Sequence, residues 1–113
     1  MEQHFGIEER AEHGISIVVV TGEIDVATAP QLQECLHSLI SEGQTNLVLD
    51  LLGVTFLDST ALGVLVGALK RCREEQGDLH LVVSEPRIVK IFEITGLTTV
   101  FPIVDSLAAA GAA

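Results

Sequence analysis

The sequence has few basic residues and neither tryptophan nor tyrosine. Six Lys and Arg residues stand against sixteen Asp and Glu residues, and the formal net charge is −10 when His is counted as neutral. Because neutralising phosphates or anionic lipid headgroups requires a basic face, this balance argues against nucleic-acid binding and against docking on a membrane surface. Aromatic residues make up only 4% of the chain, so we expect no surface on which sugars or bases stack.

Motifs for phosphate loops, metals and cofactors are also lacking. No GxGxxG, GxxxxGK[ST], HExxH or CxxC pattern occurs, and the four His residues are scattered along the chain. Ser59 lacks the flanking glycines of a nucleophile elbow, and the sequence places no His beside it. We therefore expect no metal, no cofactor and no enzymatic activity. A small hydrolase that uses Ser59 is the alternative from another class, and a serine-directed phosphonate would detect it.

Only two cysteines are present, Cys35 and Cys72, and they lie 37 positions apart without any metal-binding spacing. We expect both to be reduced and packed, as in a cytoplasmic protein, and a redox switch between them stays an open hypothesis. The acidic segment 1–14 has no apolar core and does not resemble a signal peptide. The apolar stretch 47–69 contains two Asp residues, which argues against a membrane span.

The acidic charge is concentrated in the first half of the chain. Residues 1–60 carry ten acids and one base, a net charge of −9, whereas residues 61–113 carry six acids and five bases, a net charge of −1. A charged partner should therefore meet the first half, and it should itself be basic.

What is present is enough apolar sequence for one domain. The 113 residues are 48% hydrophobic, which predicts a single domain over 1–113 with its core at about 4–110. Strand and helix patterns alternate: expected strands span 4–10, 15–20, 47–51, 79–83 and 99–104, and expected helices span 28–43, 58–76, 84–96 and a short Ala-rich segment after Asp105. The order β-β-α-β-α-β-α-β-α predicts an α/β fold, a mixed sheet of four to five strands with about four helices.

The first expected helix is amphipathic. Thr28 is expected to be its N-cap, with Gln31 completing a capping box, and Gly43 is expected to end it. Its apolar face is Leu32, Cys35, Leu36, Leu39 and Ile40.

The start of the second expected helix is chemically unusual. Asp58, Ser59 and Thr60 are small polar residues between apolar runs, and Asp58 or Ser59 is expected to be the N-cap. Gly63 and Gly67 lie four residues apart inside the helix, where each costs about 1 kcal/mol relative to Ala. Two explanations would justify this cost: the helix packs closely against the sheet at these glycines, or another protein approaches the helix closely there.

A short loop around residues 53–56 is expected before the second expected helix. A second polar connection, residues 21–25 (TGEID), precedes the first expected helix. If both connections lie at one edge of the sheet, Asp25 converges on Asp58 and Ser59, because ligand and partner sites favour the C-terminal ends of strands. A solvated turn is the alternative for Asp25.

These segments are familiar together. TGEID, the strand LVLDL, the helix start FLDSTALGVLVGALKR and the segment KIFEITGL resemble the bacterial anti-sigma factor antagonists (anti-anti-sigma factors) of the STAS domain family, from about His13 to Val104. The resemblance implies a STAS-like domain. It also implies phosphorylation of Ser59 by the partner, an anti-sigma factor that is itself a serine kinase and binds the ATP.

The resemblance further implies the cycle in which the protein works. The unphosphorylated antagonist binds the anti-sigma factor and releases the sigma factor, and a metal-dependent serine phosphatase resets the phosphorylated form. The implied partner-binding residues are Glu23, Asp25, Asp58, Ser59, Thr60, Ala61 and Gly63. Many family members have Gly where this chain has Ala61, so we expect an added methyl group at the contact edge.

Three questions stay open on the sequence alone. Thr60 is an alternative acceptor of the phosphoryl group. The same fold also serves as an interaction module in other assemblies, such as a signalling scaffold or a transporter-associated subunit. The chain is expected to be a monomer or a weak homodimer.

Overall fold

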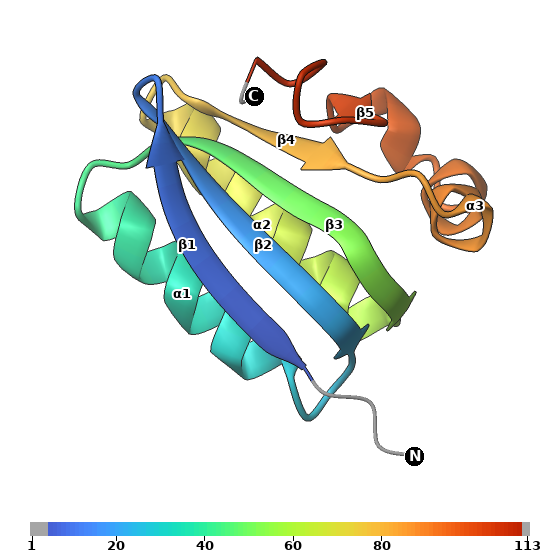
Figure 1. Cartoon of the computed structure of the whole chain (residues 1–113). Helices are drawn as coiled ribbons and strands as arrows, with labels where there is room; N and C mark the ends of the chain where they lie inside the picture. Colours follow the sequence, from blue (N-terminus) through green and yellow to red (C-terminus); the bar gives the residue numbers. More distant parts are fainter. Residues whose placement is uncertain (1–4, 112–113) are drawn as a thin grey trace.

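The computed structural model describes residues 5–111, which form one mixed sheet with helices packed against it (Figure 1). In chain order the elements are β1 (Gly6–Glu12), β2 (Ile15–Ile24), α1 (Ala29–Ser41), β3 (Asn46–Leu57), α2 (Ser59–Glu74), β4 (Asp78–Val82), α3 (Pro86–Ile94), a 3-10 helix η1 (Leu97–Thr99) and β5 (Ile103–Val104). The predicted α/β class and five-stranded mixed sheet are confirmed.

The strand order in the sheet is β1-β2-β3-β4-β5, the same as the order along the chain. β1 and β2 form an antiparallel hairpin, and every later pair is parallel. The hairpin turn is His13-Gly14, in which both residues have positive φ, as a two-residue turn matching the strand twist requires. Since β2, β3 and β4 are parallel, the connections to α1, α2 and α3 all leave from the same edge of the sheet.

The core lies between the sheet and the helices. α1 and α2 lie side by side on one face of the sheet (Figure 1). The predicted apolar face of α1 is buried there except for Cys35, which is half-buried, and α2 buries one face. Ile88 and Phe92 of α3 join the same cluster, in which Phe92 packs edge-on against Phe101 at 6.1 Å between ring centres. On the opposite face, Ile17, Val48 and Val82 form a smaller cluster that the C-terminal segment covers with Leu107 and Ala110.

Two strands run further than predicted, and this corrects the expected loops. β2 continues through the TGE segment to Ile24, and β3 continues through the expected loop Gly53–Phe56 to Leu57. The glycines that suggested breaks instead permit the pairing. A Cβ on Gly53 would lie 2.8 Å from Cγ2 of Thr21, so only glycine allows β2 and β3 to approach at that point.

The expected fourth helix is wrong: within residues 5–111 there are three α-helices. After Asp105 the chain forms turns, in which Oγ of Ser106 accepts a hydrogen bond from Ala109 N at 3.1 Å, and Gly111 has a φ of +76°. A helix this short does not recover the cost of nucleation from propensity alone. The last strand, expected over 99–104, is limited to Ile103–Val104, because Thr99 belongs to η1 and the backbone N–H groups of Val100 and Phe101 both donate to the Leu97 carbonyl.

The first strand, expected over 4–10, is shifted toward the hairpin, and His4 lies outside the described residues. None of the helices in the described part of the chain is both long and apolar enough to cross a membrane.

Candidate functional site

The two polar connections meet at one edge of the sheet. Ile24 at the end of β2 pairs with Leu57 at the end of β3, so Asp25 and Asp58 follow paired residues on neighbouring strands. A backbone hydrogen bond from Asp58 N to Ile24 O, 3.2 Å long, ties the two connections together. The expected convergence of Asp25 with Asp58 and Ser59 is therefore present in the structure.

Asp58 is the N-cap of α2. Its backbone is extended, with φ −113° and ψ −173°, and its Oδ1 accepts a hydrogen bond from Ala61 N at 3.0 Å. One of the unpaired N–H groups of the first turn is satisfied in this way. Of the two N-cap candidates, Asp58 takes the role and Ser59 does not.

Ser59 is the first residue of α2, and its side chain is exposed. Its hydroxyl makes no hydrogen bond to any residue in the described range 5–111. The hydroxyl thus contributes no hydrogen bond to the fold and is exposed at the positive end of a 16-residue helix. No His or carboxylate of those residues is hydrogen-bonded to it as a base, so the site lacks the pairing that activates a serine nucleophile.

Asp25 stabilises the β2–α1 connection through side-chain hydrogen bonds. Its Oδ1 accepts hydrogen bonds from Ala27 N at 2.9 Å and Thr28 N at 3.1 Å. The hydroxyl of Thr28 accepts from Asp25 N at 2.9 Å and donates to the carbonyl of Glu23 at 2.8 Å. Asp25 is half-buried, so the alternative of a merely solvated turn residue is wrong.

These bonds also correct the capping box expected at α1. Thr28 occupies the N-cap position, but its side chain makes no capping bond to the helix, so the pairing with Gln31 does not form. The Thr28 hydroxyl is already used by the backbone of the preceding connection.

The other predicted partner-binding residues differ in exposure. Thr60 and Gly63 are exposed in the first turns of α2, and Glu23 is half-buried and pairs with Phe56 of β3. Ala61 is 0% exposed and belongs to the core. The expectation that its methyl group lies at the contact edge is wrong, because the second residue after the helix start faces the sheet.

The two helix glycines are not packed. A Cβ built on Gly63 or on Gly67 meets no atom within 4 Å. Close packing against the sheet, the simpler of the two expectations, is therefore wrong for both residues.

Two apolar side chains near the site were not predicted. Val26, directly after Asp25, is 71% exposed, and Phe56, two residues before Asp58, is 46% exposed. Exposed apolar residues beside a polar cluster are typical of protein contact surfaces. For Val26, an apolar residue inside a polar turn was the signal in the sequence. For Phe56, the segment was expected to be a loop, so the alternation of a strand was not used to predict that its side chain is exposed.

The cysteines lie away from this edge. Cys35 of α1 has its pKa raised to about 12 by burial and by its hydrogen bond to Glu9. Burial and the nearby Asp78 carboxylate raise the pKa of Cys72. Both are free thiols that stay protonated at neutral pH. In the region 5–111 no group of three or more His, Cys, Asp or Glu residues is arranged to hold a metal ion.

Comparison with known proteins identifies the family. The sequence model of the STAS domain matches residues 7–110. The chain is similar to the anti-sigma-B factor antagonist of Listeria monocytogenes, with 42% identity over 97 residues, which cover 86% of this chain and 84% of that protein. It is also similar to the anti-sigma-B factor antagonist of Staphylococcus aureus, with 36% identity over 94 residues, 83% of this chain and 87% of that protein.

A solved structure agrees with these relatives. The crystal structure of an anti-sigma factor antagonist from Mycobacterium paratuberculosis superposes with a TM-score of 0.88 at 31% sequence identity. The match covers 95% of this chain and 91% of that chain.

Proposed function

The chain belongs to the STAS domain family, and from that premise we propose that it is an anti-sigma factor antagonist switched by phosphorylation of Ser59. Its unphosphorylated form binds an anti-sigma factor serine kinase and thereby releases the sigma factor. The kinase brings the ATP and phosphorylates Ser59, and a serine phosphatase resets the protein. The relatives named as anti-sigma-B factor antagonists support this role.

One observation carries the choice of Ser59. Asp58 caps α2, and the exposed Ser59 hydroxyl has no hydrogen bond to the rest of the described chain. A kinase can therefore modify this oxygen without breaking a bond on which the fold depends. Thr60 is also exposed, but it lies one position further into the helix.

The fold should tolerate the phosphate. A phosphoserine adds about −1.5 to −2 charges at neutral pH. At the first residue of α2 it meets the positive end of the helix dipole, equivalent to about +0.5 charge, and N–H groups that can hold an anion. Phosphorylation then changes the surface of the protein and leaves its architecture unchanged.

The complex should not tolerate it. The phosphate joins Asp58, Asp25 and Glu23 at an edge of the sheet that is already acidic. If the partner's interface fits a neutral hydroxyl, the complex with the phosphorylated protein must either bury a dianion or dissociate. Burying an unpaired charge costs several kcal/mol, and about 2.8 kcal/mol already weakens binding 100-fold. No conformational change is required.

The surface also suggests what the partner presents. Exposed Val26 and Phe56 offer apolar contact, and the carboxylates of Glu23, Asp25 and Asp58 surround it with negative charge. The complementary face is an apolar patch rimmed by Lys or Arg.

The test is phosphorylation and binding with the anti-sigma factor kinase purified from the same organism. Incubation with ATP should add one phosphate to the wild type and to Thr60→Ala, and none to Ser59→Ala, as read by intact mass. Ser59→Ala should bind the kinase as the unmodified wild type does. Ser59→Asp should bind about 100-fold more weakly. Equal affinity of Ser59→Ala and Ser59→Asp would contradict the switch, and phosphate on Ser59→Ala would contradict the acceptor.

A further inference from the structure

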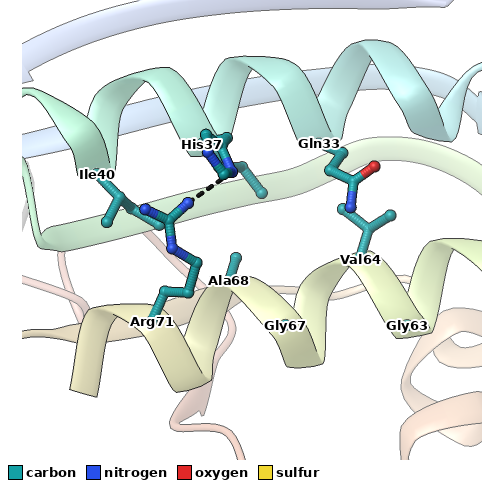
Figure 2. Close-up of a pocket in the computed structure, with 9 residues that line it drawn as sticks. Gln33, His37, Ile40, Gly63, Val64, Gly67, Ala68 and Arg71 are labelled. Carbon is teal, nitrogen blue, oxygen red and sulfur yellow. Dashed lines mark hydrogen bonds between the residues drawn. The ribbon is translucent and has the colours of Figure 1, made fainter. Parts of the chain in front are cut away.

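A groove runs between α1 and α2, outside the cluster at the sheet edge. Figure 2 shows its two walls: Gln33 and His37 on α1 and the segment from Gly63 to Arg71 on α2. The groove has a volume of about 260 Å³. Gln33 reaches toward Val64 near one end, and Arg71 reaches toward His37 near the other (Figure 2).

The glycines leave this groove open at a cost to the helix. Glycine is the least favourable helix residue apart from proline, and neither Gly63 nor Gly67 is needed for packing within the described chain, because a Cβ on either would meet no atom within 4 Å. Both residues are exposed on the same stripe of α2 as Thr60 and Lys70. A stripe without side chains admits the close approach of another backbone.

The far end of the groove carries a cation, Arg71, that lies in the last turn of α2 and has no carboxylate partner within residues 5–111. Nη1 of the half-buried Arg71 lies 2.6 Å from Nδ1 of His37. Two positions further on, Arg73 pairs with Asp78 at 3.2 Å. In a chain of net charge −10, a half-buried arginine without a carboxylate is suited to an anionic group from outside.

We propose that this groove receives an α-helix of the partner kinase, with a Glu or Asp of that helix bound by Arg71 and His37. The inference rests on the proposed function and extends its contact surface from Ser59 along α2. Along the groove, from Gly63 to Arg71, the helix rises about 12 Å, which matches a partner helix of about two turns. A helix lying in a groove between two others is a common recognition mode.

Charge favours a partner over a second copy of this chain. Each copy carries a net charge of −10, so two copies repel one another at long range, whereas a basic-rimmed partner is attracted. The partner's contact face should then carry opposite charges at its two ends: basic residues against Asp25 and Asp58, and an acidic residue against Arg71.

The experiment measures the affinity of unphosphorylated full-length variants for the purified anti-sigma factor kinase, together with their melting temperatures. Gly67→Ala should raise the melting temperature, because Ala is the better helix former and has open space, yet weaken binding about tenfold. Arg71→Ala should also weaken binding about tenfold. Arg73→Ala is the matched control from the same helix end, and its affinity should stay within about twofold of the wild type.

The outcomes separate this inference from the proposed function. If Ser59→Asp loses binding while Gly67→Ala and Arg71→Ala bind as the wild type does, the groove is not part of the interface and the proposed function stands. If the wild type does not bind the kinase, both fall. Sedimentation showing wild-type self-association that Gly67→Ala abolishes would assign the groove to a second copy and overturn the proposal.

Discussion

The connections β2–α1 and β3–α2 contain the same chemistry, an Asp followed by a hydroxyl residue, yet they use it differently. In the first, Asp25 holds backbone N–H groups of its own turn, and the Thr28 hydroxyl bridges Asp25 N and the Glu23 carbonyl. In the second, Asp58 caps the helix and the Ser59 hydroxyl has no hydrogen bond within residues 5–111.

The fold depends on one of these two hydroxyls and not on the other. Thr28 lies three positions after Asp25, so its hydroxyl reaches back to the turn and becomes part of it. Ser59 directly follows its Asp, at the first position of the helix, and its exposed hydroxyl has no hydrogen-bond partner within residues 5–111. Modifying the Thr28 hydroxyl would break the connection, whereas modifying that of Ser59 should leave the connection intact.

The largest effect that would sharpen this contrast comes from removing each hydroxyl. Thr28→Val leaves Asp25 N and the Glu23 carbonyl without their partner, and the free energy of unfolding should fall by about 2 kcal/mol. Ser59→Ala should change it by less than about 0.5 kcal/mol. Because the chain has no Trp or Tyr, urea unfolding followed by far-ultraviolet circular dichroism is the suitable measurement. Similar losses for both variants would erase the contrast.

A smaller effect tests whether Asp58 alone caps α2. Asp58→Ala removes the bond to Ala61 N and should lower the free energy of unfolding by about 1 kcal/mol. Asp58→Asn keeps a capping oxygen and serves as the control, with a loss of less than about 0.5 kcal/mol. The same urea titrations measure both. If Asp58→Ala were as stable as the wild type, the Ser59 hydroxyl would be able to cap α2 in place of Asp58, and the fold would then use it.

The smallest expected effect concerns Cys35 of α1, away from both connections, and changes the free energy of unfolding only at alkaline pH. The folded state holds the Cys35 proton more tightly than the unfolded chain, so this stabilisation is complete below pH 9.0 and is lost as pH rises toward about 12. Discounted for partial exposure, it should amount to less than about 1 kcal/mol.

The measurement for Cys35 is the pH dependence of unfolding in the wild type and in Cys35→Ala. The stability of the wild type should fall more steeply above pH 9.0 than that of the variant. Parallel curves would show that burial and the Glu9 contact do not hold the proton in solution.

Apolar spacing together with a polar residue before each helix predicted α1, α2 and α3, although the capping box expected at the start of α1 does not form. It failed where glycine was taken as a break, because Gly22 and Gly53 lie inside paired strands. Gly53 permits close pairing with Thr21, and Gly22 has a φ of +91° at a shift in the strand register. It failed again after Asp105, where an Ala-rich run with helix propensity forms turns.

At the candidate site, local order along the chain predicted Asp58 or Ser59 as the cap and the convergence with Asp25. It did not predict the burial of Ala61, because which side of a helix start faces the sheet depends on packing. The exposure of Val26 and Phe56 and the groove beside Gly67 were also missed, since each depends on elements distant in the sequence.

The alternation of strands and helices, the acidic first half and the polar helix start follow from residue type and spacing along one segment, so they can be predicted from the sequence. Packing between distant segments sets which hydroxyl has no hydrogen bond within residues 5–111, which methyl group is buried and which glycines face open space. Those properties depend on what lies across the sheet edge or on the neighbouring helix, and no single segment contains both sides of such a contact.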